Sequence, residues 1–400
     1  MTTPLGRRDF LRQATTATVA ATAASYSRVL GANDRIRLAL IGCSGQGEGV
    51  MKLCQRDPAV EFVALCDVWE RRIEERRMLA PGAAGLGDHR AVLDRSDVDA
   101  VIVATPDHWH SAITIDALGA GKDVYVEKPL TFRREEGPAI VEAAKASGRV
   151  CAVGIQQRSG SHYVRARDEY VGKGKLGRVH MIRMCWHSSW SKPMEVPVRD
   201  KPPDLDWKRW LGPVSWREWN PYQYFHYRAF LDFGGGKITD LFTHWIDAVH
   251  MIMGHDDPVS VAAAGGVLQI EDGRDAPDNI HLLVEYPHGY VVTFESTCLP
   301  GTPEWGIEFY GTEGRLFITR DRFEYRTHEE GALPVVVRPD HKIEEEHVDD
   351  FLACLRTRRE PNATALMGHR SAQAAHLGTL AYVSGRVVRF DPVKEEVFES

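Results

Sequence analysis

This chain lacks the cysteine patterns that are typical of disulfide frameworks and of cysteine-based metal sites. Its 400 residues include seven cysteines, an odd number, and no two of them form a C-x-x-C pair. Most stand in apolar runs, as Cys66 does at the end of 62–66. We therefore expect buried free thiols, and we predict no disulfide framework and no metal site from these residues.

A basic excess, an internal repeat and a long apolar run are absent as well. Lys and Arg total 49 against 56 Asp and Glu, a net charge of −7 with the signs interleaved. This balance argues against nucleic acid as a partner. No run reaches the roughly 20 apolar residues of a membrane span, so we expect no stable membrane insertion. The content of 43% hydrophobic and 26% charged residues is typical of a globular chain.

The first 34 residues are typical of an export signal. Arg7 and Arg8 begin a twin-arginine pattern, and a small, weakly apolar run follows at 14–24. This run is too short to span a bilayer and ends in plausible cleavage sites. We predict export through the twin-arginine route to the periplasm; the alternative is the disordered, basic end of a cytoplasmic protein. Because that route carries folded proteins, the chain would bind any cofactor inside the cell.

The remaining residues are enough for two domains, which we place at 35–155 and 156–400. In the first, apolar strands alternate with helical segments, which predicts an α/β domain with a parallel sheet of the Rossmann type. In the second, short strands between Gly or Asp turns predict an α+β domain with an antiparallel sheet. The expected strands are 36–41, 62–66, 100–104 and 123–127 in the first domain, then 258–270, 279–285, 290–297, 306–310 and 315–319.

A glycine-rich turn follows the first strand and precedes a helical segment. Gly42, Gly45 and Gly47 match a dinucleotide-binding fingerprint, although Ser44 takes the place of its second glycine. Such a turn directs backbone N–H groups and the helix dipole at phosphate, so we assign these residues and Gln46 to cofactor binding. An ordinary strand-to-helix turn is the alternative for this motif on its own.

An acid at the end of the second strand indicates which nucleotide is bound. Asp67 stands 20 residues after Gly47, where a carboxylate can accept hydrogen bonds from the adenosine ribose, and this favours NAD. Arg71 and Arg72 follow closely, so NADP is the weaker alternative. The other residues that we assign to the cofactor site follow the third and fourth strands: Thr105, Pro106, His108, His110, Glu127 and Lys128.

Two further motifs carry chemistry. Lys128 ends a strand at the edge where a parallel sheet presents its ligands, and Pro129 biases it toward extended backbone. An ammonium group held beside a nicotinamide suits hydride transfer at an alcohol or carbonyl. On the expected helix 238–253, Asp240 and His244 lie one turn apart and so share a face. A solvated polar stripe is the alternative for that pair.

Together these motifs resemble those of the Gfo/Idh/MocA oxidoreductases, the relatives of glucose–fructose oxidoreductase and inositol dehydrogenase. The resemblance covers nearly the whole chain after the first 34 residues. It implies that Lys128, Asp240 and His244 form the catalytic group. It also implies an open sheet whose face often packs against another subunit, hence a homodimer or homotetramer. The segments that carry it are 42–47, 104–110, 127–129 and 234–244.

We expect this group to move a hydride between NAD and a carbon of a sugar, sugar derivative or cyclitol. His244 is the expected general base for the hydroxyl proton, because imidazole titrates near neutral pH. Lys128 would stabilise the developing alkoxide or share the proton transfer, and Asp240 would orient the substrate. Which of Lys128 and His244 takes the proton stays open. Because free nicotinamide cofactor should be scarce outside the cytoplasm, we expect the cofactor to be held throughout turnover.

Substrate contacts are expected at the domain junction and in the aromatic segments that follow it. Aromatic faces beside hydrogen-bond donors suit carbohydrates, whose C–H faces stack while their hydroxyls need partners. For each of these residues, packing inside a large loop is an equal alternative. The candidates are Gln156, Arg158, Trp186, His187, Tyr227 and Arg228.

Three alternatives remain open at this point. An NAD-dependent glycoside hydrolase or lyase would oxidise a sugar transiently and eliminate its glycosidic bond. Exported relatives of that kind tend to carry Tyr-Pro-Thr-His, whereas this chain has Thr239-Asp240-Leu-Phe-Thr-His244. A non-catalytic, NAD-bound sugar-binding protein is the second alternative. The third is metal catalysis through Asp240 and His244; Lys128 would repel the cation, so we predict no catalytic metal.

Overall fold

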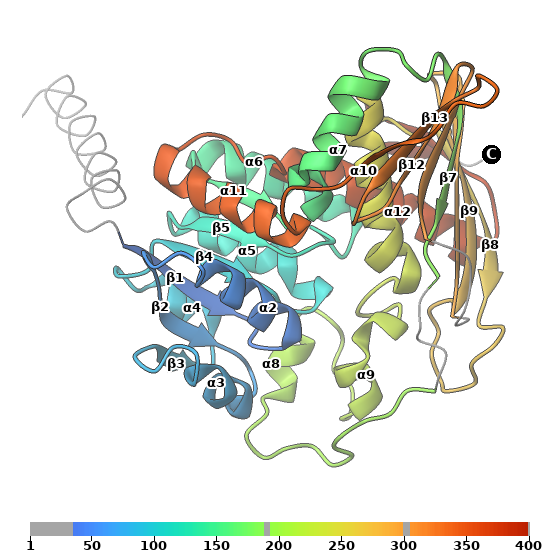
Figure 1. The fold of residues 1–400 in the computed structure, drawn as a ribbon. Helices are drawn as coiled ribbons and strands as arrows, with labels where there is room; N and C mark the ends of the chain where they lie inside the picture. Colours follow the sequence, from blue (N-terminus) through green and yellow to red (C-terminus); the bar gives the residue numbers. More distant parts are fainter. Residues whose placement is uncertain (1–34, 188–192, 299–304, 399–400) are drawn as a thin grey trace, which may run out of the picture.

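The computed structural model describes residues 35–187, 193–298 and 305–398; the predicted export signal at 1–34 lies outside them. Two sheets organise these residues (Figure 1), one of six strands in the order β3-β2-β1-β4-β5-β6 and one of ten in the order β14-β13-β12-β11-β7-β10-β9-β8-β15-β16. The first is a parallel Rossmann sheet and the second is mostly antiparallel. This architecture confirms the predicted fold class.

The Rossmann sheet is built from strands whose side chains are buried on both faces, as parallel strands require. All of β4 and β5 is buried, and so is all of β1 except Arg37. The strands are β1 (Ile36–Ile41), β2 (Val60–Cys66), β3 (Ala84–Leu86), β4 (Ala100–Val103), β5 (Asp123–Val126) and β6 (Cys151–Val153). Its helices are α2 (Gly45–Cys54), α3 (Glu70–Arg77), α4 (His89–Leu93), α5 (His110–Gly119) and α6 (Gly137–Ser147).

The large sheet of the second domain has one face packed on helices. Its central strand β10 alternates buried and half-buried residues, which is the pattern of a sheet covered on one side. Helices α10 and α12 supply the apolar side chains that cover it (Figure 1). Its strands are β7 (Val179–Cys185), β8 (Ser260–Gly266), β9 (Asn279–Tyr286), β10 (Tyr290–Thr297), β11 (Gly306–Gly311), β12 (Gly314–Ile318), β13 (Phe323–Thr327), β14 (Val335–Val337), β15 (Val388–Asp391) and β16 (Glu396–Phe398).

The predicted helix 238–253 has two parts, a π-helical turn at Ile238–Phe242 and the α-helix α10 at Thr243–Met253. Its π-helical turn contains Asp240 and its first α-helical turn contains His244. Single π turns inside helices are frequent at functional sites, because the wider turn alters where side chains and carbonyls point. The other helices of this domain are α7 (Ser161–Arg165), α8 (Trp207–Leu211), α9 (Pro221–Phe225), α11 (Ile343–Thr357) and α12 (Ala365–Ser384).

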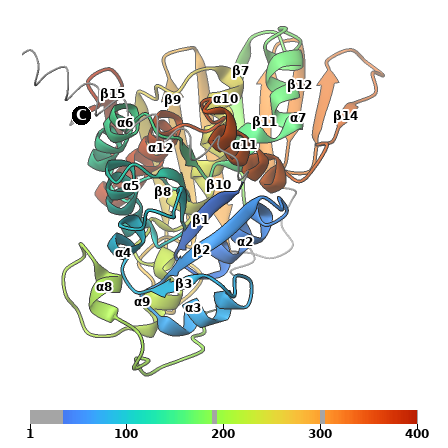
Figure 2. The ribbon, with the colours of Figure 1, turned by 90° about the vertical axis from the view of Figure 1, so that its left-hand side faces the viewer.

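The end of the chain returns to the Rossmann domain. Val348, Phe351 and Leu352 of α11 are buried in the same core as α2, on one face of the parallel sheet (Figure 2). Helix α12 lies close enough to β6 that a side chain at Gly368 would collide with Val153. The packing unit around the first sheet therefore includes a segment far outside 35–155. Within the described residues, no helix has both the length and the apolar character needed to cross a membrane.

Candidate active site at the junction of the two domains

The glycine turn has the geometry that a bound pyrophosphate requires. Gly42 has φ +95°, and a Cβ there would lie 2.5 Å from the carbonyl oxygen of Ala104. A Cβ at Gly47 would lie 2.1 Å from the carbonyl oxygen of Gly42, so both positions accept only glycine. Ser44 begins α2 without capping it through its side chain. The N–H groups of the first turn of α2 therefore point toward the cleft beside the turn.

Asp67 follows β2 directly beside this turn. Its carboxylate accepts hydrogen bonds from the backbone N–H groups of Cys43, at 2.8 Å, and Trp69, at 2.9 Å. Burial raises the pKa of Asp67. The two backbone bonds fix the carboxylate at the wall of the cleft, where its position suits the ribose contact expected from the sequence.

Glu127 and Gln46 join the glycine turn to the end of β5. The side-chain amide of Gln46 donates a hydrogen bond to the Glu127 carboxylate at 2.8 Å. Both residues line a cavity of about 220 Å³ that also takes in Thr105 and Pro106, and it reaches from Gly42 to Lys128. The predicted cofactor residues from three separate βα turns thus meet around one cavity, which is the arrangement that a dinucleotide needs.

Lys128 of the first domain contacts Asp240 of the second domain. Its ammonium group donates to a carboxylate oxygen of Asp240 at 2.5 Å and to the backbone carbonyl of Asp240 at 2.9 Å. The peptide bond between Lys128 and Pro129 is cis. Arg228 lies on the other side, with its Nε 3.1 Å from the same Asp240 oxygen. Burial opposes ionisation of Asp240, but the two cations outweigh it and lower its pKa to about 2.

His244 lies one turn beyond Asp240 and is buried. Its Nδ1 lies 3.2 Å from the side-chain oxygen of Gln157, and its ring packs against the ring of Trp186 with centroids 5.7 Å apart. Burial, and then the positive charge of Lys128, lowers the pKa of His244 well below 6.5. The imidazole is therefore neutral at physiological pH, and it can accept a proton there.

Asp107 is a residue of this site that the sequence patterns did not indicate. Its side chain is 1% exposed, and burial raises its pKa against the opposing charge of Arg228. It lies beside Tyr227, whose hydroxyl is its hydrogen-bond partner, and one of its carboxylate oxygens has no partner among the described residues. The one signal in the sequence was its place between Pro106 and His108, two residues already assigned to the site.

A segment of the second domain covers the cofactor cleft; we call residues 193–233 the covering segment. The Trp69 indole donates to Asp204 at 3.1 Å, and Arg209 donates to the carbonyl of Gly87 at 2.7 Å. The Trp69 ring also meets the ring of Tyr224 edge-on, with centroids 5.7 Å apart. The covering segment therefore lies over the ends of β2 and β3, on the side of the cleft that holds Asp67.

The remaining cofactor candidates, His108 and His110, have different surroundings. His110 lines the cavity, and its ring nitrogens lie 2.7 Å from the carbonyl of Pro129 and 2.9 Å from that of Thr105. His108 is not among the lining residues; its Nε2 lies 2.8 Å from the carbonyl of Trp210, and burial lowers its pKa to about 4. His110 thus holds the backbone at Pro129, next to Lys128. His108 contacts the covering segment at Trp210.

The predicted substrate residues divide into two groups. Tyr227 and Arg228 lie in the site beside Lys128 and Asp240. Arg158 instead donates to Asp247 at 2.9 and 3.0 Å, a buried ion pair that holds α10 against the domain junction. The side chain of Gln156 bonds Tyr125 in the core of the first domain. Its neighbour Gln157, which we had not predicted, is the one that reaches His244.

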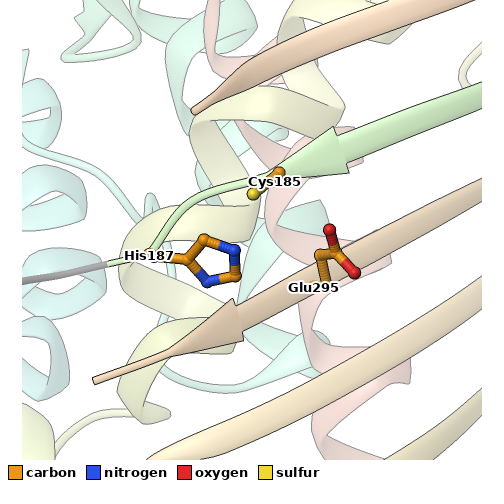
Figure 3. A group of neighbouring side chains, drawn as sticks. All are labelled: Cys185, His187 and Glu295. Carbon is orange, nitrogen blue, oxygen red and sulfur yellow. The ribbon is translucent and has the colours of Figure 1, made fainter. Parts of the chain in front are cut away.

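Trp186 and His187 lie at the end of β7. The Trp186 ring packs against the rings of His244 and Trp305, so it forms part of the wall around His244. His187 lies with Cys185 and Glu295 (Figure 3). Its Nδ1 accepts a hydrogen bond from the backbone N–H of Thr297 at 3.3 Å. The structure thus brings Trp186, but not His187, into contact with the predicted catalytic group.

A parallel sheet with a glycine turn that only glycine can form, and a buried Lys–Asp pair at the ends of its strands, defines a dinucleotide-binding protein of two domains. Comparison with known families agrees. Residues 36–155 match the family described as "Oxidoreductase family, NAD-binding Rossmann fold", and residues 175–400 match "Oxidoreductase family, C-terminal alpha/beta domain". The chain belongs to this Gfo/Idh/MocA oxidoreductase family, and its first domain is the family's NAD-binding domain.

Individual relatives are more distant. The chain is 25% identical to levoglucosan dehydrogenase of Pseudarthrobacter phenanthrenivorans over 59% of each chain, so it spans little more than half of that relative. It is 24% identical to scyllo-inositol 2-dehydrogenase (NAD(+)) of Bacillus subtilis over 89% of this chain and 97% of the relative. A solved structure of levoglucosan dehydrogenase with NADH and levoglucosan has a TM-score of 0.71 at 20% identity, covering 89% of this chain and 99% of that one, which shows the same fold.

Proposed function

We propose that this protein is an NAD-dependent oxidoreductase that acts on a CH–OH group of a sugar, sugar derivative or cyclitol. The observation that carries the proposal is the buried contact between Lys128 and Asp240, with His244 one turn away, at the end of the NAD cleft. The family relatives named above act on levoglucosan and scyllo-inositol, which are both rich in secondary hydroxyls.

The residues present fit the cofactor. The glycine turn leaves room for a pyrophosphate against the start of α2, and Asp67 stands where the adenosine ribose would lie. Thr105, Glu127 and Lys128 would line the path of the nicotinamide half. When bound, NAD supplies the hydride acceptor. NADP is the weaker alternative, because the Asp67 carboxylate would repel a 2′-phosphate.

The side chains around Lys128 would handle the proton. The neutral imidazole of His244 is the proton acceptor that we propose for the substrate hydroxyl. Its lowered pKa makes it a weak base by itself, so the ammonium of Lys128 is needed to stabilise negative charge on the same oxygen. The Asp240 carboxylate contacts both Lys128 and Arg228. Its negative charge therefore offsets the repulsion between the two cations.

The direct test is to present the protein with a panel of inositols, anhydrosugars and aldoses and to follow reduction of NAD by its near-ultraviolet absorbance. We expect at least one polyhydroxy compound to reduce NAD and to give the matching ketone or lactone as product. Cleavage of a glycoside with no net reduction would instead support the hydrolase alternative. Sugar binding without turnover would support the sugar-binding alternative.

We also propose that the protein is exported with its cofactor already bound. The twin-arginine pattern at Arg7 and Arg8 supports export, and the covering segment over the Asp67 side of the cleft supports retention of the cofactor. Residues 1–34 fused to a reporter should direct it to the periplasm, and replacing both arginines with lysine should keep it in the cytoplasm. Protein purified without added nucleotide should release near-stoichiometric NAD or NADH on denaturation; an empty protein would contradict retention.

A homodimer or homotetramer remains our prediction for the assembly. The face of the large sheet that α10 and α12 leave uncovered carries the exposed Leu283, opposite Thr293 of β10. Light scattering of the purified chain would give its mass directly. A monomer at micromolar concentration would contradict this prediction without affecting the proposed reaction.

A further inference from the structure

Three metal-ligating side chains of different chemistry meet at the end of β7, away from the catalytic group. Their ligand atoms all lie within 4.8 Å of one another (Figure 3): the sulfur of Cys185, a ring nitrogen of His187 and a carboxylate oxygen of Glu295. Within the described residues, no other group of three such side chains comes this close. The cluster departs from our expectation of no metal site at the cysteines, because Glu295 lies 110 residues after Cys185 and no local pattern links the two.

The sheet itself creates this cluster. Strands β7 and β10 run parallel with Cys185 directly beside Glu295, so the two side chains leave the sheet on the same face. That face is opposite to the one on which Met184 and Phe294 enter the core beneath α10. His187 follows two residues after Cys185, beyond the end of the strand. Two of the three side chains therefore stand on hydrogen-bonded neighbouring strands. This favours a defined geometry over a chance meeting of surface side chains.

We propose that Cys185, His187 and Glu295 form a binding site for a divalent transition-metal ion of the zinc type. Sulfur, imidazole nitrogen and carboxylate oxygen are the three ligand kinds that zinc accepts, and three protein ligands leave a fourth position for water. Ligands of a tetrahedral zinc lie about 2.0–2.3 Å from the ion, so small side-chain rotations would close this cluster. His281 faces Glu295 on the next strand, β9, and adds a second imidazole near the open position.

The competing occupant of Glu295 is Arg183. Its guanidinium contacts the Glu295 carboxylate at 2.5 Å, but the Arg183 side chain is 50% exposed and that of Glu295 is 28% exposed. An exposed pair of this kind contributes little, because water screens both charges. A metal ion with three protein ligands can therefore displace Arg183, which swings into solvent. Replacing Arg183 should consequently strengthen metal binding.

An ion at this position would hold the wall of the active site. Trp186 lies between the ligands Cys185 and His187, and its ring packs against His244. Its backbone N–H also donates to the carbonyl of Glu295 at 3.1 Å. The ion would thus fix the backbone on both sides of Trp186 without touching substrate or NAD, which makes it a structural and positioning site.

The test uses the full protein, stripped of metal with a chelator and titrated with zinc chloride in a calorimeter. We expect one ion per chain. Cys185→Ser and His187→Ala should each weaken binding at least tenfold, while Arg183→Gln should tighten it. His180→Ala is the matched control, because His180 is an exposed histidine on the same strand outside the cluster, and its affinity should be unchanged.

Cobalt(II) gives an independent measurement that needs no variant to fold. The wild-type protein loaded with cobalt should show a near-ultraviolet thiolate-to-metal absorption band, and the band should vanish on addition of zinc. Absence of saturable zinc binding, or a cobalt complex without the thiolate band, would overturn the proposal. Equal affinity of the wild type and Cys185→Ser would do so as well. NAD content is measured in every sample, so loss of the cofactor site is told apart from loss of the metal site.

Discussion

At the scale of single residues, the central feature is one buried carboxylate shared by two cations, the buried Lys128 and the partly exposed Arg228. Asp240 contacts both Lys128 and Arg228, and its pKa falls to about 2 although burial opposes its charge. Loss of Asp240 would leave two positive charges together without their shared carboxylate, and loss of Lys128 would remove the nearer of its two cations. Buried charges are stabilised only in such paired arrangements.

Replacing Lys128 and His244, the two groups that we propose to act on the substrate oxygen, tests this arrangement. We expect Lys128→Met and His244→Ala each to lower kcat by about 10²–10⁴-fold, the usual contribution of positioned acid–base groups, without abolishing cofactor binding. Steady-state kinetics and bound-NAD content are the measurements. Lys145→Met, at an exposed position of α6, is the control and should leave kcat unchanged. Full activity of either active-site variant would remove that residue from the mechanism.

The pH profile tests the state of His244. Because burial and Lys128 lower its pKa well below 6.5, the ring stays neutral on going from pH 8 to pH 6.5. Protonation, which would remove the proton acceptor, begins only at lower pH. We therefore expect kcat/KM to stay level through pH 6.5 and its acid limb to lie below. An acid limb centred at pH 6.5 or above, in protein shown to be folded, would contradict the burial argument.

The sequence predicted some of these residues better than others. Lys128, Asp240 and His244 were predicted from their motifs, and the structure places Lys128 on Asp240. Gln157 was missed in favour of Gln156, because the short 3₁₀ turn at Gln156–Ser159 decides which of two adjacent side chains enters the site. Asp107 was missed because nothing in its local pattern shows that the chain around Tyr227 folds over it.

At the scale of elements, the covering segment and α11 are the parts that tie the domains together. The covering segment contacts the first domain through Trp69 and Gly87, and α11 is buried against α2. Both begin far along the chain from the elements that they touch. Periodicity and turn residues predicted four of the six parallel strands and five of the ten strands of the second sheet, since these depend on local patterns. Contacts over such separations have no local signal, so the particular residues that form them were not predicted.

Loosening the covering segment should speed release of the cofactor. Asp204 accepts hydrogen bonds from the Trp69 indole at 3.1 Å and from the backbone N–H of Arg71 at 3.2 Å. Each is worth about 0.5–1.5 kcal/mol, so Asp204→Ala should raise the NAD dissociation rate roughly tenfold. Stopped-flow displacement of bound NADH measures this rate. Asp200→Ala, an exposed acid on the same segment, should not change it; an equal rate in both variants would show that the segment does not retain the cofactor.

At the scale of the whole molecule, buried neutral histidines set the response to acid. Burial lowers the pKa of His108 and His347 to about 4 and that of His250 to about 3. In the unfolded chain these groups titrate near 6.5, so between pH 6.5 and 4 the unfolded state binds more protons. The stabilisation is complete above pH 6.5 and is lost as the pH falls through that window.

The size of this effect predicts acid unfolding. A pKa lowered from 6.5 to about 4 corresponds to about 3 kcal/mol for each histidine, and three such groups together fall within the 5–15 kcal/mol that stabilises a typical domain. We expect the free energy of unfolding to fall steeply below pH 6.5 and the protein to unfold before pH 4. Urea titrations across this range, with circular dichroism as the probe, measure it. A constant free energy of unfolding from pH 7 to pH 4.5 would contradict the assigned burial of these histidines.

In the reaction that we propose, hydride passes between a CH–OH carbon of the substrate and NAD beside Lys128 and His244. The most direct measurement uses a substrate found in the panel and labelled with deuterium at the reacting carbon. We expect the label to appear on C4 of the reduced nicotinamide in the wild-type protein. In Lys128→Met the rate of this transfer should be about 10²–10⁴-fold lower. Deuterium lost to solvent while a glycosidic bond breaks, with NAD left oxidised at the end, would contradict it.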